Sequence, residues 1–289
     1  MDQRIIDLYD EYTHAPLPRR VFLARLSRLA GGTAAAAALL PMLESNYAHA
    51  EMIAKDDARI APSHVSFGGA TGPVKAYLVK PQGKPGNAGK FPAVVVIHQN
   101  RGLNPHIEDV ARRFAVEGFL AIAPDFLSPL GGTPADDDQA RGMFGKLDRD
   151  QTIGNAVAAV GYAKSHPAST GKVATCGFCW GGGLSNQAAV HSPELNAAVV
   201  YYGQQPSDAD AAKIKAKLLI QYAGLDTRIG AGADAYEKAL TAAGVSHTNY
   251  VYEGANHAFN DDTAGARYNA EAAKLAWGRT INFLKSALA

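Results

Sequence analysis

The sequence predicts an α/β fold, with a mostly parallel central sheet flanked by helices on both faces, from two observations. After residue 51, short apolar runs alternate with longer segments of helical periodicity up to the C-terminus. The apolar runs are unbroken, which is typical of strands buried on both sides. Residues 51–289 show no repeat, linker or low-complexity tract, so we expect a single domain there.

Each expected element is one of these runs or periodic segments. Residues 64–67 and 74–79 flank a glycine-rich turn and predict an opening antiparallel hairpin. The other predicted strands are 93–97, 119–123, 173–176, 197–201, 218–222 and 248–252. The predicted helices are 107–117, 152–164, 182–190, 233–243 and 266–287. Residues 124–150 break this rhythm and predict an excursion beyond a strand end, where sheets of this kind bind ligands. Its acidic triplet, 136–138, is expected to be solvated surface or a helix start, because no histidine stands at metal-ligand spacing.

Composition limits the classes of partner. The 289 residues are 47% hydrophobic, enough for a substantial core. Lys and Arg total 28 against 27 Asp and Glu, so the net charge of +1 gives no general attraction to nucleic acid or anionic membrane. We expect a small-molecule partner and no nucleic acid, and make no prediction of oligomeric state. The two cysteines, Cys176 and Cys179, are too close in sequence for a disulfide framework.

The first 50 residues differ from the rest and resemble a twin-arginine export signal. Arg19 and Arg20 precede a weakly apolar stretch, residues 29–43, which is shorter than the ~20 residues needed to span a bilayer. Residues 48–50 (Ala-His-Ala) fit a cleavage site before Glu51. These features predict a periplasmic or secreted protein without stable membrane insertion. The alternative is a cytoplasmic protein with an uncleaved, amphipathic N-terminal helix, because residues 1–18 are unusually long and acidic for such a signal.

The run Gly177-Phe178-Cys179-Trp180-Gly181-Gly182-Gly183 carries the strongest chemical signal. It follows a predicted strand, precedes a predicted helix and has the G-x-C-x-G pattern of a nucleophile elbow. Glycines on both sides allow the tight turn, and the helix N-terminus lowers the pKa of a thiol. No G-x-S-x-G occurs in the sequence, so Cys179 is the predicted nucleophile.

An elbow of this kind needs an acid and then a histidine later in the chain. Three histidines follow Cys179, and His191 and His247 lie at predicted helix and strand ends. His257 lies in a glycine-containing loop after the last strand, where a catalytic histidine is expected. Asp226 follows the strand at 218–222 and is the predicted acid.

These motifs together resemble the dienelactone hydrolase family of α/β-hydrolases over nearly all of residues 60–289. The resemblance implies an α/β-hydrolase fold, a triad of Cys179, His257 and Asp226, and no metal or organic cofactor. It also implies an oxyanion hole from the backbone N–H of Trp180 and, by analogy, of Asn100. The expected reaction is hydrolysis of an ester or lactone through a thioester, as in a carboxymethylenebutenolidase. The resemblance rests on residues 96–102, 123–125, 177–182, 201–203, 224–226 and 257–259.

Two departures bear on the substrate. The family has a glutamate where this chain has Gln99, and an amide cannot take up a proton as a carboxylate does. Of two family arginines that bind a substrate carboxylate, one corresponds to Arg141 and the other falls at Asp261, which would repel an anion. We therefore expect a neutral ester or lactone to be at least as good a substrate as dienelactone. Gln99, Arg141 and Tyr202 are the substrate-binding candidates.

Two alternatives stay open at this point. Cys176 and Cys179 have the C-x-x-C spacing of dithiol oxidoreductases, although a cysteine at position 176 would lie inside a buried strand. A non-catalytic, ligand-binding relative of the α/β-hydrolases is the other alternative.

Overall fold

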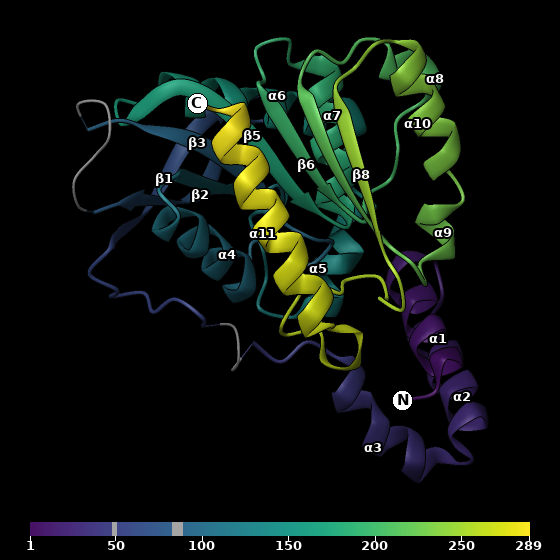
Figure 1. Ribbon diagram of the computed structural model, residues 1–289. Helices are drawn as coiled ribbons and strands as arrows, with labels where there is room; N and C mark the ends of the chain where they lie inside the picture. The colour runs from purple at the N-terminus through teal and green to yellow at the C-terminus, as the bar shows by residue number, and fades with distance from the viewer. Residues whose placement is uncertain (48–50, 83–88) are drawn as a thin grey trace.

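The computed structural model of the chain describes residues 1–47, 51–82 and 89–289. Its centre is an eight-stranded sheet in the order β1-β2-β4-β3-β5-β6-β7-β8 (Figure 1). The hairpin of β1 and β2 is antiparallel, β2 pairs antiparallel with β4, and all other neighbours are parallel. This confirms the predicted fold class. The strands are β1 (Ile60–Gly69), β2 (Gly72–Pro81), β3 (Phe91–Ile97), β4 (Leu120–Pro124), β5 (Ser169–Phe178), β6 (Ala197–Tyr201), β7 (Lys217–Ala223) and β8 (His247–Tyr252).

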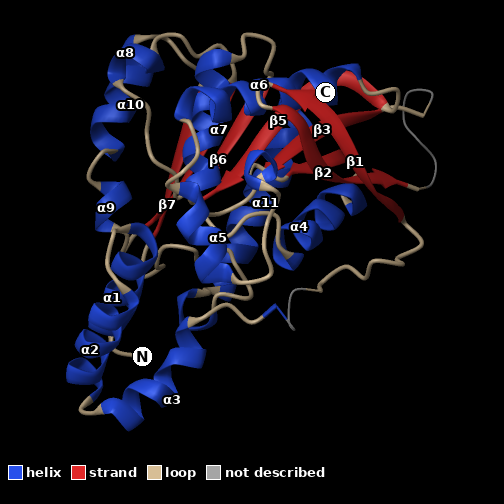
Figure 2. Cartoon of the chain, turned by 180° about the vertical axis from the view of Figure 1, so that it is seen from behind, coloured by secondary structure: helices blue, strands red, loops and turns tan. Residues whose placement is uncertain are grey.

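Helices cover both faces of the sheet (Figures 1 and 2). Strand β3 shows how one strand serves two cores, because successive side chains point to opposite faces. Val95 and Ile97 pack in the apolar cluster under α6, α7 and α10, whereas Val94 and Val96 pack in the cluster under α4 and α11. These helices are α4 (Pro105–Val116), α6 (Arg149–Ser165), α7 (Trp180–His191), α10 (Ala233–Ala242) and α11 (Ala270–Ala287).

Helix boundaries differ from the predicted ones where polar side chains cap the helix. Helix α6 starts three residues earlier than predicted because Asp148 accepts a hydrogen bond from the Gln151 N–H. Helix α11 starts later because Asn269 caps it, after a short 3₁₀ turn at Gly265–Arg267.

The predicted excursion after β4 contains a 3₁₀ turn (Ser128–Leu130) and α5 (Asp137–Phe144). Asp136 caps α5 by accepting from the Gln139 N–H, so the acidic triplet is a helix start, as one of the two interpretations held. Asp137 and Asp138 make ion pairs with arginines, Asp137 with Arg101, and so are not free surface carboxylates.

The N-terminal segment folds into α1 (Gln3–His14), α2 (Arg19–Ala30) and α3 (Thr33–Leu43). These helices share an apolar cluster of their own, in which the Tyr12 and Phe22 rings stack and Leu26 is fully buried. Helix α1 lies beside α9 (Thr227–Gly230), the short helix that follows β7, at the edge of the sheet where that strand ends (Figure 1). The segment therefore contacts the part of the fold in which ligands are expected.

No single described helix combines the length and apolar character needed to cross a bilayer; α2 and α3 meet that test only together, across a 110° bend. The predicted cleavage site at residues 48–50 lies outside the described residues. Export and cleavage therefore stay predictions.

Candidate active site

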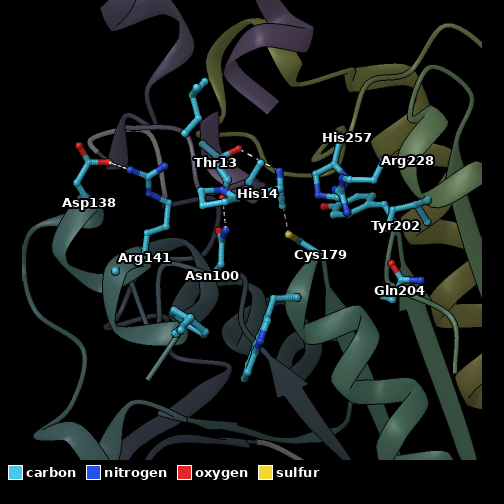
Figure 3. A pocket seen from close by; sticks show the side chains of 18 residues that line it. Thr13, His14, Asn100, Asp138, Arg141, Cys179, Tyr202, Gln204, Arg228 and His257 are labelled. Atoms are coloured by element: carbon cyan, nitrogen blue, oxygen red, sulfur yellow. Dashed lines mark hydrogen bonds and ion pairs between the residues drawn. The ribbon is translucent and has the colours of Figure 1, made fainter. Parts of the chain in front are cut away.

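Cys179 lies on a strained turn between β5 and α7. Its backbone has φ 56° and ψ −116°, a conformation that a residue with a side chain rarely adopts. A hydrogen bond of 3.0 Å from the Cys179 N–H to the Tyr201 carbonyl oxygen holds the turn. Cys179 directly precedes the first residue of α7, its sulfur faces His14 (Figure 3), and 6% of the residue is exposed. The predicted elbow is confirmed as a structure.

Glycines next to Cys179 are required by close backbone contacts. A Cβ at Gly177 would overlap the carbonyl group of Gly181, and one at Gly181 would overlap the carbonyl oxygens of Ile97 and His98. A Cβ at Gly182 would lie 2.7 Å from the Tyr201 carbonyl oxygen. The elbow can therefore form only with these residues lacking a side chain.

His257 and Asp226 come together from two loops at the same edge of the sheet. His257 Nδ1 lies 2.5 Å from Asp226 Oδ2, and both side chains are buried. Asp226 also caps α9 by accepting from the Ile229 N–H at 3.1 Å, which fixes the carboxylate. With Nδ1 bound to Asp226, Nε2 is the nitrogen left for the nucleophile. That atom is buried and has no hydrogen-bond partner among the described residues.

His14, at the end of α1, also reaches the sulfur. Its Nε2 lies 3.1 Å from Cys179 Sγ, and its ring packs edge-on against His257 at a centroid distance of 4.5 Å (Figure 3). Ring nitrogens of both histidines and the sulfur all lie within 4.8 Å of one another. Sequence reasoning missed His14 because it belongs to the segment interpreted as an export signal. The one available signal was the amphipathic spacing of Ile5, Ile6, Tyr9 and Tyr12.

The charges around the sulfur favour a thiolate. Burial would raise the pKa of Cys179, but the positive charges of His14 and His257 outweigh it and hold that pKa well below its ordinary value. Burial would likewise lower the pKa of His257, but the charges of Cys179 and Asp10 and the Asp226 hydrogen bond raise it to about 10. Both pKa shifts favour a thiolate on Cys179 and an imidazolium on His257.

A cavity of about 590 Å³ opens above the sulfur, within the range of small-molecule sites. Cys179, Trp180, Tyr202 and Asn100 line it from the hydrolase domain, and residues 13–17 line it from the N-terminal segment. Figure 3 shows Cys179 and His257 facing this space, with Arg141 at its opposite side. The site is thus an open-mouthed pocket, and the N-terminal segment forms part of its wall.

Comparisons with known proteins agree on one family. The model of the dienelactone hydrolase family matches residues 74–288. The chain belongs to the dienelactone hydrolase family. A Yersinia pestis protein named "Putative carboxymethylenebutenolidase" is 33% identical over 223 residues, which cover 72% of this chain and 82% of that protein.

Solved structures of the dienelactone hydrolase type share the fold. A Klebsiella pneumoniae structure titled as that of a "Putative Dienelactone Hydrolase" superposes with a TM-score of 0.70 at 28% identity, covering 78% of this chain and 98% of its own. The dienelactone hydrolase-like promiscuous phosphotriesterase P91 from metagenomic libraries has a TM-score of 0.70 at 25% identity, covering 80% of this chain and 100% of its own. The prediction of an ester- or lactone-cleaving hydrolase is confirmed at the level of the family, which disfavours the non-catalytic alternative.

Two substrate-binding candidates of this family member are engaged within the protein. Gln99 is buried outside the lining of the cavity and donates to Asp261 Oδ2 at 3.1 Å. The Arg141 guanidinium donates to the Tyr12 carbonyl oxygen, lies 4.0 Å from the centre of the Tyr12 ring, and pairs with Asp138 at 3.3 Å. Their roles in substrate binding stay predictions.

The expectation that Asp261 repels substrate directly needs correction. Its carboxylate is buried away from the cavity lining and accepts hydrogen bonds from Thr263 and Gln99. Burial would raise the pKa of Asp261, but the charges of His106 and Arg267 and the Thr263 bonds lower it. Sequence alone could not show that this charge faces inward.

The remaining predicted residues lie at the cavity. Tyr202 has φ 40°, and its ring centroid is 4.9 Å from that of His257. Trp180 is the first residue of α7, so its N–H has no acceptor inside the helix. Asn100 lines the same cavity, and its side chain donates to the Thr13 carbonyl oxygen at 2.8 Å. The oxyanion role of the two backbone N–H groups stays a prediction.

The residues around the sulfur fit hydrogen bonding better than metal binding. A tetrahedral zinc ion with ordinary bond lengths would separate its nitrogen and sulfur ligands by about 3.5 Å. The 3.1 Å between His14 Nε2 and Cys179 Sγ is instead the length of a hydrogen bond to sulfur. We therefore interpret these groups as a hydrogen-bonded set.

Proposed function

We propose that this member of the family hydrolyses carboxylic esters and lactones through a Cys179–His257–Asp226 triad and a thioester intermediate. The observation that carries the proposal is that a strained cysteine and a histidine meet on one cavity, with the histidine's Nδ1 bound to the buried Asp226 carboxylate and its Nε2 without a hydrogen-bond partner in the described part of the chain. Each group has the environment that its role requires.

Acylation starts from the thiolate. The Cys179 sulfur attacks the substrate carbonyl carbon, and the carbonyl oxygen becomes an oxyanion beside the free Trp180 N–H and the N-terminal end of α7. As the carbon–oxygen bond to the alcohol breaks, His257 gives its Nε2 proton to the leaving alkoxide. The products of this step are a thioester on Cys179, a free alcohol and a neutral His257.

In deacylation His257 accepts a proton, whereas in acylation it gives one. Neutral His257 takes a proton from water while the hydroxide attacks the thioester carbon, and the carbon–sulfur bond breaks to release the acid and the thiolate. Asp226 holds Nδ1 and stabilises the imidazolium that forms again. Water is consumed, and no cofactor takes part.

A neutral ester or lactone is the substrate class that the cavity supports best. The cavity wall includes the aromatic side chains of Trp180, Tyr202 and Phe144, which suit an apolar acyl group. Arg141, the predicted anion-binding residue, is already engaged with Asp138, which also pairs with Arg19, and with the Tyr12 carbonyl oxygen. A substrate carboxylate would have to displace these contacts.

The redox alternative is not supported by the surroundings of Cys176. This thiol lies in the apolar core, and burial raises its pKa well above the ordinary value. A thiol of this kind is a poor attacking group. Both cysteines are free.

Single cysteine variants test the proposal. With p-nitrophenyl acetate and δ-valerolactone as probes, Cys179→Ala is expected to lower kcat/KM by about 10³-fold or more, because the covalent step is lost. Cys176→Ala is the matched control and is expected to keep activity within about threefold, since its thiol makes no part of the site. Full hydrolysis by a folded Cys179→Ala enzyme would reject the triad. Equal losses in both variants would favour dithiol chemistry.

A further inference from the structure

The sulfur of Cys179 has two histidines around it, and each has a carboxylate behind it. His257 is backed by Asp226, and His14 is backed by Asp10, one helical turn earlier in α1. His14 Nδ1 lies 2.9 Å from the Asp10 carbonyl oxygen and 3.1 Å from Asp10 Oδ1. The second pair comes from the N-terminal segment and differs in one respect: the Nδ1 hydrogen bond of His14 is to the Asp10 backbone carbonyl, and Asp10 Oδ1 lies beside it with no hydrogen-bond partner among the described residues.

The hydrogen bonds of His14 define its protonation state. Nδ1 lies 2.9 Å from the Asp10 carbonyl oxygen, which can only accept, and 3.1 Å from the Thr13 hydroxyl, and Nε2 faces a sulfur that is a thiolate in the proposed mechanism. Only an imidazolium can donate from both nitrogens. Burial and the positive charge of His257 would lower the pKa of His14, but the charge of Cys179 and the contacts with Asp10 and the sulfur outweigh them and raise it. His14 is therefore a cationic donor to the sulfur.

The cluster contains charges of both signs, and the like charges of His14 and His257 lie with their ring centroids 4.5 Å apart. Asp10, Cys179 and Asp226 are anionic, whereas His14, His257 and Arg228 are cationic. Arg228, on α9, lies beside both pairs: its Nε is 3.7 Å from Asp10 Oδ2, an opposite charge, and its Nη2 is 3.4 Å from His257 Nδ1, a like charge when His257 is protonated. Tyr202, from the loop after β6, adds a buried hydroxyl whose pKa burial raises. Removing His14 would leave the buried thiolate with one cation fewer.

The N-terminal segment leaves room for substrate. The cavity of about 590 Å³ persists with α1 in place, and residues 13–17 form its wall. The segment is also held by polar contacts outside the sulfur: Asn100 donates to the Thr13 carbonyl oxygen, and Tyr12 donates to Asp138 at 3.0 Å. These features indicate that the N-terminal segment is a permanent part of the site and does not have to dissociate before substrate binds.

We propose that His14, oriented by Asp10, is a second catalytic histidine for Cys179, and that the N-terminal helices remain part of the working enzyme. The inference rests on the proposed role of Cys179 as nucleophile. His14 donates its Nε2–H to the sulfur whenever the sulfur is charged, in the resting thiolate and when the thiolate departs from the thioester. It neither gains nor loses a proton over the cycle, and His257 carries the transferred proton.

Alkylation of Cys179 tests this inference without substrate turnover. The full-length protein is treated with iodoacetamide from pH 5 to 9, and modification of Cys179 is followed by peptide mass spectrometry. In His14→Gln, the midpoint of the alkylation profile is expected to rise by about one pH unit or more, with about a tenfold slower reaction on the acid side. Asp10→Asn should shift it in the same direction by less. His191→Gln, at the exposed end of α7, is the matched control and should not shift it.

Kinetics with p-nitrophenyl acetate separate the inference from its alternatives. His14→Gln is expected to lower kcat about tenfold or more and to change KM by less than about threefold. An unchanged alkylation profile in a folded His14→Gln variant would overturn the inference, as would a rise in kcat/KM, which would identify α1 as an inhibitory plug. If His14→Gln does not fold, the Asp10→Asn profile decides by the same criteria.

The intact mass of the active enzyme supplies a second, independent readout. A species that retains His14 is expected. An active mature form beginning at Glu51 would overturn the inference and favour the export prediction. Because loss of activity in Cys179→Ala is measured separately, failure of the triad can be distinguished from failure of the His14 role.

Discussion

The two halves of the site differ in how they are built. Cys179, His257 and Asp226 lie on loops of one parallel sheet, so the sheet's register fixes their separation. His14 lies on α1, a helix outside the sheet that packs mainly within the cluster of α1, α2 and α3. The sheet fixes Cys179, His257 and Asp226 relative to one another, whereas the position of His14 depends on the docking of a small helical unit.

The largest loss of stability and activity is expected from adding a side chain at Gly181, in the elbow of Cys179. In Gly181→Ala the new methyl group would overlap the Ile97 and His98 carbonyl oxygens, which are backbone atoms that cannot move aside. We expect destabilisation of more than about 3 kcal/mol and no measurable hydrolysis. Gly161→Ala is the control, since its Cβ would meet open space within a helix, and is expected to be neutral or stabilising. Urea unfolding measures the stability of the two variants, and p-nitrophenyl acetate hydrolysis measures their activity. An active, stable Gly181→Ala enzyme would show that the elbow tolerates a side chain at position 181.

Asp226→Asn is expected to have the next largest effect, because it leaves the fold of the loop but removes the charge behind His257. kcat should fall by about 10²- to 10⁴-fold. The wild type should lose activity on the alkaline side near pH 10, since the raised pKa of His257 is the point at which the general acid loses its proton. In the variant this limb should move to lower pH, because the hydrogen bond that helps to raise the pKa is gone. A pH–rate profile of the wild type and of Asp226→Asn checks both expectations. If the alkaline loss of activity occurs at the same pH in the two enzymes, it belongs to a group other than His257.

The docking of the N-terminal unit is tested by Leu26→Ala. Leu26 is fully buried in the cluster of α1, α2 and α3, so its truncation should weaken local folding of that unit by about 2–5 kcal/mol. Cleavage by a protease within residues 1–47 should become faster, and kcat should fall toward the value of His14→Gln. Leu29→Ala, on the same helix but exposed, is the control. Faster proteolysis with unchanged kcat would mean that the unit is not needed for catalysis.

Gln99→Glu is expected to have the smallest effect on catalysis. The substitution removes the donor to Asp261 and places two buried carboxyl groups about 3 Å apart, which raises the pKa of one of them. Stability should fall by about 1.5–3 kcal/mol, while kcat/KM for a neutral ester should change by less than about threefold, because Gln99 does not line the cavity. Thermal unfolding and kinetics measure the two effects. A shift of preference toward dienelactone in this variant would mean that position 99 reaches the substrate.

The sheet and the grouping of Cys179, His257 and Asp226 at one edge of it could be predicted from strand patterns and chain order. Strand β3 is an unbroken apolar run, and the elbow of Cys179 requires glycines at fixed positions. His257 and Asp226 follow from chain order after strands, a rule of the topology.

His14 could not be predicted in this way, because no local pattern records a contact between residues 165 positions apart. The same holds for Asp261, whose sequence position suggested a charge facing substrate but whose side chain turns into the protein. Residues 19–43 carry arginines followed by an apolar stretch, and that composition fits both an export signal and a packed helical pair.

Trapping the acyl group on Cys179 is the most direct test of the thioester mechanism. Wild-type enzyme mixed with p-nitrophenyl acetate and quenched in acid within its first turnovers should gain one acetyl group, located by peptide mass spectrometry on the peptide that contains Cys179. The adduct should be absent in Cys179→Ala and present in Cys176→Ala. Hydrolysis at the normal rate without any adduct on Cys179, or with the acetyl group on another residue, would contradict the thioester mechanism.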